Sequence, residues 1–278
     1  CPTNSSSERG RNEATGSAAA TSSDAGSDDP GSTGSASRSW SVGAGVVIDD
    51  RAFDPEQGLD LLQRLAVTVL CQPPTEYRAI GKAGANLPGA LPRLRHAVST
   101  GEALEAGLVE DYRDGAGITL RDGLTQAECG PLAGTLPRMP VRPGVLGVAA
   151  PGHDVSVIDA SGYVVEAGEE GELALLGRPP TLFTEYLGAP EATAAAIRDR
   201  WYLTGDRCVR EEDGSIRYLG RTDDVIVSAG RRIGPVEVEA AVGSHPLVEE
   251  VAAVASPDAD RGAVVKAFVT LAPGAAPG

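Results

Sequence analysis

Three short blocks within the last third of this sequence are rich in aspartates, arginines and glycines. The blocks lie at 201–206, 220–224 and 230–239. Asp206 follows a glycine, and its carboxylate offers two acceptor oxygens that suit the adjacent hydroxyls of a ribose. Arg221 also follows a glycine, and its planar guanidinium suits a phosphate. A turn aspartate is the simpler alternative for Asp206, but the three blocks together indicate a ribose and phosphate clamp.

The fixed order of these blocks is far harder to meet by chance than a lone glycine motif. They resemble the signature of adenylate-forming enzymes, and residues 232–239 are most similar to medium-chain acyl-CoA synthetases. The resemblance covers 45–278 and implies an AMP-forming acid–thiol ligase of fatty acid metabolism. In that family a carboxylic acid and Mg-ATP give an acyl-adenylate and pyrophosphate, and coenzyme A then forms the thioester and releases AMP. ATP, Mg²⁺, coenzyme A and a small carboxylic acid are therefore implied.

A second stretch, residues 121–128, matches in register the family's Tyr-Gly-Gln-Thr-Glu block and retains Gln126 and Glu128. The resemblance implies that Glu128 helps to hold Mg²⁺, which prefers hard oxygen ligands. The Gly-Glu turn at 101 matches a turn that lines the adenine pocket, although taken alone it is more simply a glycine at a helix entry. The implied ATP or AMP contacts are Gly101, Glu102, Ala103, Asp122, Gly123, Leu124, Thr125, Gln126, Ala127, Asp206 and Arg221.

The residues after 222 resemble the start of the family's small C-terminal domain. Asp223 coincides with the hinge about which that domain rotates, and its place between a strand and the next domain fits a hinge. A solvated acidic turn is the alternative. By motif register Arg232 faces the reaction centre as a substrate contact. The residues matched to the coenzyme A path are Ala229, Gly230, Arg231 and Arg261.

Two cationic parts of the family's machinery are not found in the sequence. A phosphate loop with its lysine is expected upstream, and the adenylation lysine is expected downstream of Gly278. Neither Lys82 nor Lys266 stands in such a context, and the glycine-rich residues 31–35 are better explained as a flexible linker than as a phosphate loop. We therefore expect a fragment without the catalytic lysine and with little turnover. Three further departures from the family pattern are Ala103 for proline, Leu124 for tyrosine and Ala127 for threonine.

Strands that alternate with helices must position these groups. Residues 45–49 predict a short strand, Asp54 an N-cap with Pro55 at the first helical position, and 67–71 a β-branched strand. This alternation favours an α/β sheet covered by helices. From 143 to 175, short strands between glycine turns predict a hairpin-rich subdomain that resembles the family's small β-barrel.

The domain boundaries follow from composition and from the resemblance. Residues 1–39 are rich in small and polar types. They can bury too little apolar surface to offset the conformational entropy lost on ordering, so we expect disorder. Residues 40–222 are expected to be the C-terminal part of the large AMP-binding domain. Residues 223–278 are expected to be a truncated small α+β domain, with a helix that begins at Pro235 and two later strands.

Composition excludes several classes of function. The net charge of −15 disfavours nucleic acids and anionic membrane surfaces. The sequence has neither an apolar run of eighteen residues nor a secretory signal pattern, so the cytoplasm is the default prediction. Cysteines and histidines are too scattered for a disulfide framework or a metal site of their own. The oligomeric state is left open.

Two alternatives to the ligase remain. The adenylation domain of a peptide synthetase would share the nucleotide motifs but pass its acyl group to a carrier domain. A non-catalytic nucleotide-binding or assembly module would retain the motifs without the reaction.

Overall fold

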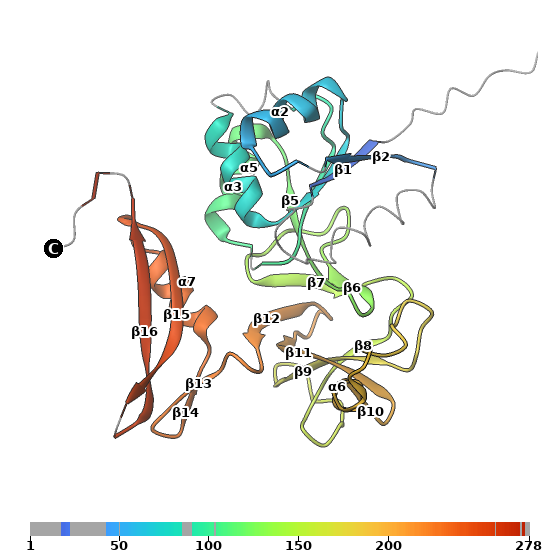
Figure 1. Cartoon of the computed structure of the whole chain (residues 1–278), viewed down its shortest axis with the longest axis vertical. Helices are drawn as coiled ribbons and strands as arrows, with labels where there is room; N and C mark the ends of the chain where they lie inside the picture. The colour runs from blue at the N-terminus through green and yellow to red at the C-terminus, as the bar shows by residue number, and fades with distance from the viewer. Residues whose placement is uncertain are drawn as a thin grey trace, which may run out of the picture.

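The structure, a computed structural model, describes residues 18–22, 43–49, 51–84, 91–102, 104–258, 260–272 and 274–275. Its first half alternates strands and helices, as the sequence predicts (Figure 1). The elements are β1 (Ala18–Ser22), β2 (Gly45–Asp49), α2 (Pro55–Arg64), β3 (Val69–Gln72), α3 (Pro74–Ala83), β4 (His96–Ser99), α5 (Ala106–Ala116) and β5 (Leu120–Gln126). The strands are mutually parallel in the order β2-β1-β3-β4-β5.

The start of α2 is set by its local sequence. Asp54 is the N-cap, and its carboxylate accepts a hydrogen bond of 2.8 Å from the main-chain N–H of Gln57. Pro55 occupies the first turn, where its missing N–H is not needed. Both predictions for this helix entry are confirmed.

Two buried tyrosines tie α3 and α5 to the parallel strands. The rings of Tyr77 and Tyr112 meet edge to face, with centroids 5.4 Å apart and planes at 85°. The Tyr77 hydroxyl donates to the carbonyl oxygen of Leu70 at 2.9 Å, and the Tyr112 hydroxyl donates to the carbonyl oxygen of Tyr77 at 2.7 Å. Both polar ends are therefore satisfied inside the core, where an unpaired hydroxyl would be costly.

The second half of the sheet is antiparallel. Its elements are β6 (Gly130–Gly134), β7 (Val145–Ala149), β8 (Val155–Ile158), β9 (Glu170–Leu176), α6 (Pro190–Ala196), β10 (Ile197–Arg198), β11 (Trp201–Arg210) and β12 (Ile216–Arg221). The order continues from β5 as β6-β7-β12-β11-β9-β8, and β10 pairs with β11. The hairpin-rich character is as predicted. Among the described strands the pairings form an open path, so closure into a small barrel stays a prediction.

Strands β6 and β7 approach each other closely at Gly147. This residue has φ +111°, and a Cβ built on it would lie 2.1 Å from the carbonyl oxygen of Gly134. No side chain fits that space, so only glycine permits the close approach.

The C-terminal elements are β13 (Ile226–Ser228), β14 (Arg231–Ile233), α7 (Pro235–Gly243), β15 (Val248–Asp258) and β16 (Gly262–Leu271). They form two antiparallel hairpins, β13–β14 and β15–β16, with α7 packed on β15. Pro235 opens α7, as predicted. Two ion pairs join β15 to α3: Lys82 Nζ lies 2.5 Å from Glu249 Oε1, and a nitrogen of Arg78 lies 3.9 Å from Glu250 Oε1.

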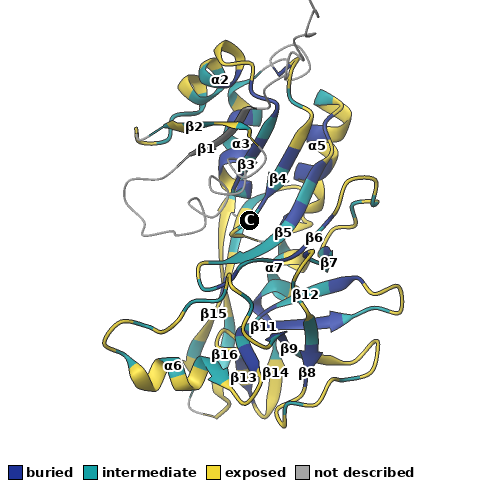
Figure 2. Ribbon diagram, turned by 90° about the vertical axis from the view of Figure 1, so that its right-hand side faces the viewer, coloured by how far each residue is buried: buried dark blue, intermediate teal, exposed yellow. Residues whose placement is uncertain are grey.

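The described helices include none that is both long and apolar enough to cross a membrane. The buried side chains instead gather inside the sheet halves. One cluster lies between the parallel strands and helices α2, α3 and α5, and a second lies within β6 to β12. Figure 2 shows buried segments along β4, β5, β9 and β11, whereas much of the C-terminal hairpin is exposed.

The expectation of disorder for 1–39 needs one correction. Residues Ala18–Ser22 form β1, which pairs in parallel with both β2 and β3. A prediction from composition depends on apolar content. It does not take into account the main-chain hydrogen bonds that β1 forms with a strand on each side. The rest of 1–39, including the glycine-rich stretch 31–35, lies outside the described residues.

Candidate functional site

A cleft that is open to solvent lies where the ends of β4 and β5 meet β11 and β12. It is therefore placed beyond the carboxyl ends of parallel strands, where ligands of open α/β sheets collect. The residues predicted from sequence that line it are Gly101, Glu102, Asp122, Gly123, Leu124, Thr125, Gln126, Asp206 and Arg221. The other lining residues, which were not predicted, are Leu104, Gly144, Leu146, Tyr218 and Val236.

Asp206 is the most deeply buried charge of the cleft, with 2% of its surface exposed. Its Oδ2 accepts a hydrogen bond of 2.7 Å from Gln126 Nε2, and its main-chain N–H donates to Thr204 Oγ1 at 3.0 Å. Burial raises the pKa of the Asp206 carboxyl, and Arg221 acts most strongly in the opposite direction. The surrounding donors fix the orientation of the carboxylate, which suits recognition of a diol.

Arg221 lies directly across the strand pair from Asp206, because the two residues are partners in the register of β11 and β12. Its NH1 atom donates to the carbonyl oxygen of Thr204 at 3.0 Å and lies 3.5 Å from Asp206 Oδ1. Its Nε donates to Asp223 Oδ1 at 3.2 Å. The side chain is still 41% exposed. The guanidinium is thus held in place while a face remains open to an anion.

Gly205 makes room for this guanidinium. Its φ is +74°, and a Cβ built on it would lie 2.8 Å from Arg221 NH2. A side chain there would be strained and would push the arginine away from Asp206. The close approach of Arg221 therefore favours glycine at position 205.

Gln126 connects two parts of the site. Its Nε2 donates to Asp206 and also to the carbonyl oxygen of Thr204 at 3.0 Å. Its Oε1 accepts a hydrogen bond of 2.7 Å from the hydroxyl of Tyr202. The amide orientation is therefore determined, since both ends have partners of the required kind. Sequence reasoning identified Gln126 but missed Tyr202, whose only signal was its position four residues before Asp206.

The floor of the cleft contains Asp122, of which 7% is exposed. Its Oδ1 accepts a hydrogen bond of 2.9 Å from the main-chain N–H of Gly123. Burial raises the pKa of this carboxyl from 3.8 to about 6. Nearby, the hydroxyls of Thr100 and Thr125 are 2.8 Å apart. Asp122 is therefore a titratable group in the cleft near neutral pH.

Glu128 lies beside the cleft, not in its lining, and is half-buried. Its Oε1 accepts a hydrogen bond of 2.7 Å from the Tyr186 hydroxyl. Within the described residues no three His, Cys, Asp or Glu side chains form a metal cage. A single carboxylate together with phosphate oxygens is a set that Mg²⁺ commonly uses, so the donor chemistry fits that ion. Sequence reasoning missed Tyr186, since 58 residues separate it from Glu128.

The remaining predicted residues lie elsewhere. Ala127 and Asp223 are exposed, and Ala103 lies outside the described residues. The tip of the β13–β14 hairpin, residues 229–232, is exposed and does not line the cleft. The structure does bring Arg261 to this tip, because the main-chain N–H of Ala229 donates to the Arg261 carbonyl oxygen at 3.0 Å.

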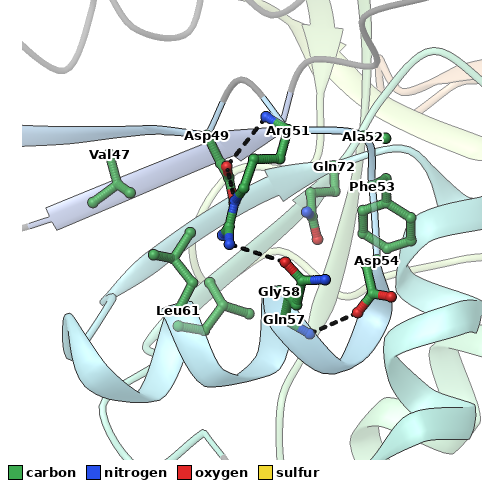
Figure 3. A pocket seen from close by; sticks show the side chains of 11 residues that line it. Val47, Asp49, Arg51, Ala52, Phe53, Asp54, Gln57, Gly58, Leu61 and Gln72 are labelled. Carbon is green, nitrogen blue, oxygen red and sulfur yellow. Dashed lines mark hydrogen bonds and ion pairs between the residues drawn. The ribbon is translucent and has the colours of Figure 1, made fainter.

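A second hollow lies between β2 and α2 (Figure 3). Three of its polar side chains bond to one another: Arg51 Nε donates to Asp49 Oδ1 at 2.7 Å, and Arg51 NH1 donates to Gln57 Oε1 at 2.9 Å. The hydrogen bond from Arg51 also holds the pKa of Asp49 below its usual value. The first cleft is the better candidate, because its charged groups converge on a shared space.

The cleft and the strand order define the class of protein. The chain matches the family "AMP-binding enzyme" over residues 37–187, and "AMP-binding enzyme C-terminal domain" over 237–277. It therefore belongs to the AMP-binding enzyme family, and its relatives include acyl-CoA synthetases.

Individual relatives make the likeness more specific. The chain is 42% identical to human "Acyl-coenzyme A synthetase ACSM4, mitochondrial" over 243 residues. This matched region covers 86% of this chain and 42% of that protein. The chain is also 42% identical over 219 residues to "Uncharacterized acyl--CoA ligase YtcI" of Bacillus subtilis, covering 79% of this chain and 41% of that protein. The ATP-bound structure of MatB from Rhodopseudomonas palustris superposes with a TM-score of 0.84 at 26% identity, covering 94% of this chain and 51% of MatB. The chain thus spans about two-fifths of the length of the curated relatives.

Proposed function

We propose that the cleft binds an adenine nucleotide and that the chain is part of a carboxylate:CoA ligase. The observation that carries this proposal is the pairing of Asp206 with Arg221 across β11 and β12. In this proposal the Asp206 carboxylate accepts hydrogen bonds from the ribose hydroxyls, and the exposed face of Arg221 binds a phosphate. The hydrogen bond from Gln126 holds the Asp206 side chain in the orientation that this requires.

Glu128 is the residue that we assign to Mg²⁺. When bound, this ion would neutralise phosphate charge during attack by a carboxylate. Coenzyme A would approach the β13–β14 tip with Arg261, Arg232 would face the reaction centre, and Asp223 would be the hinge between the two domains. These assignments rest on motif register.

The proposed reaction also needs a lysine that this chain does not provide. Lys82 is paired with Glu249 on the surface, and Lys266 lies 4.8 Å from the centre of the Phe268 ring. Neither lysine lines the cleft. We therefore propose nucleotide binding for this chain and the complete ligase reaction for the longer protein.

Calorimetric titration of Mg-ATP into the chain tests the proposal. Asp206→Asn keeps the shape of the side chain but removes its charge. We expect roughly ten- to hundredfold weaker binding, because a hydrogen bond to a charged group is worth about 1.5–3 kcal/mol. Asp111→Asn, on the exposed side of α5, is the matched control and should bind as the parent does. Equal affinities for the two variants would rule out the cleft as the nucleotide site.

The products formed distinguish the proposed ligase from the two alternative functions. A ligase in its full length forms an acyl-CoA, whereas a peptide synthetase loads the same acyl group onto a carrier domain. A non-catalytic module would bind nucleotide and form neither product. The relatives named acyl-CoA synthetases favour the ligase. The cytoplasmic location stays a prediction, since the human relative is named as mitochondrial.

A further inference from the structure

The loop between β9 and α6 contacts Glu128, which lies beside the cleft, through the side chain of Tyr186. Much of this loop is open to solvent, and Leu187 is 98% exposed. Its neighbour Tyr186 is instead half-buried, and its hydroxyl donates to Glu128 Oε1 at 2.7 Å. A residue of an exposed loop is therefore directed at the carboxylate that the proposed function assigns to Mg²⁺.

Tyr186 is held from several directions. Its main-chain N–H donates to Thr193 Oγ1 at 3.0 Å, which ties it to α6. Its ring packs on Phe183, with centroids 4.6 Å apart. The main-chain N–H of Phe183 donates to the carbonyl oxygen of Glu128 at 2.6 Å. The loop thus forms hydrogen bonds with both the main chain and the side chain of Glu128.

A second tyrosine makes an equivalent contact with Gln126, two residues before Glu128. Tyr202 donates to Gln126 Oε1 at 2.7 Å, and its ring lies 5.9 Å from that of Phe183. The two residues retained from the family's five-residue block, Gln126 and Glu128, are therefore each held by a tyrosine hydroxyl. The ring of Phe183 therefore contacts the rings of both tyrosines.

We infer that Tyr186 is a positioning residue for Glu128, holding Oε1 so that Oε2 is available to a divalent cation on the nucleotide phosphates. Within the described residues, the hydrogen bonds to this carboxylate are confined to Oε1. A carboxylate restrained at one oxygen loses less rotational freedom when the other binds a cation, and such outer partners commonly change metal affinity 10- to 100-fold. This inference rests on the proposed function.

Tyr186→Phe removes only the hydroxyl and is the variant to test. The affinity for Mn²⁺, a paramagnetic substitute for Mg²⁺, is measured by electron paramagnetic resonance with saturating ATP. We expect about 10-fold or greater weakening. Nucleotide binding in EDTA should be unchanged. Tyr163→Phe is the matched control, since Tyr163 is 74% exposed in the turn between β8 and β9, and it should behave as the parent.

The outcomes separate this inference from the proposed function. Equal Mn²⁺ affinity for Tyr186→Phe and Tyr163→Phe overturns the role of Tyr186. A parallel loss of metal-free nucleotide binding also overturns it, because that result indicates a general structural role. Glu128→Gln is the third variant: if it weakens Mn²⁺ binding while Tyr186→Phe does not, only this inference fails. If Glu128→Gln has no effect, the metal assignment fails as well. In the Glu128→Gln background, Tyr186→Phe should add little.

Discussion

The cleft strands β11 and β12 and the C-terminal strands β15 and β16 are both antiparallel pairs, yet they differ in burial. Trp201, Cys208 and Val209 on β11 are buried, whereas Phe268 and Val269 on β16 are 55% and 42% exposed. β11 lies between β9 and β12, while β15 is hydrogen-bonded to β16 alone among the described strands. Pairing fixes a backbone in both regions. Burial on several sides additionally fixes the side chains, and that is where the candidate chemistry lies.

The largest expected effect contrasts a glycine of the buried region with a glycine of the exposed hairpin. Gly147→Ala places a Cβ 2.1 Å from the carbonyl oxygen of Gly134, so the backbone must move. We expect a loss of more than about 3 kcal/mol in the free energy of unfolding. Gly262→Ala, at φ +75° with no atom within 4 Å, should lose only about 1–2 kcal/mol. Urea denaturation measures both, and equal losses would remove the proposed contrast in packing.

A second effect depends on pH and concerns Asp122. Its pKa of about 6 in the folded protein, against 3.8 normally, means that the folded state binds this proton more tightly. The associated stability is fully present below about pH 4 and is lost as the pH rises through about 6. Asp122→Asn should therefore be more stable than the parent at pH 8, by up to about 3 kcal/mol, and about equal at pH 4.

Urea midpoints at pH 4 and pH 8 check this prediction. Asp111→Asn on α5 serves as the control, because Asp111 is exposed and its replacement should leave the pH profile of the parent unchanged. A constant difference between Asp122→Asn and the parent at both pH values would show that burial of the charge is not its cause.

The smallest effect concerns the contact between the C-terminal strand β15 and helix α3, which covers the parallel half of the sheet. The Lys82–Glu249 pair joins α3 to β15, and Lys82 is 62% exposed. Exposed pairs contribute about 0–1 kcal/mol and are screened by salt. Lys82→Glu should therefore destabilise the chain by less than about 1 kcal/mol at low salt, and the double reversal with Glu249→Lys should restore the loss. A loss that persists in high salt would mean that packing, not charge, joins α3 to β15.

Local and short-range features of this protein could be predicted from its sequence. Asp54 and Pro55 determine a helix start within a few residues, and the Asp206 and Arg221 blocks lie on adjacent strands of one hairpin. Among features that depend on distant segments, the meeting of Gln126 and Asp206 in one cleft could be predicted from the family resemblance, whereas others could not be predicted. Strand β1 depends on two neighbours across the sheet, and Tyr186 meets Glu128 only after folding brings them together.

Helix α7 contributes Val236 to the wall of the cleft, and the missing side chain of Gly220 lets it come close. One wall of the cleft therefore belongs to the segment beyond the predicted hinge. A ligand that touches Val236 favours this arrangement of the two segments, and the arrangement tightens the ligand by the same factor. With a hinge at Asp223, restraining the angle between the segments and raising the ligand concentration would shift the same equilibrium in the same direction.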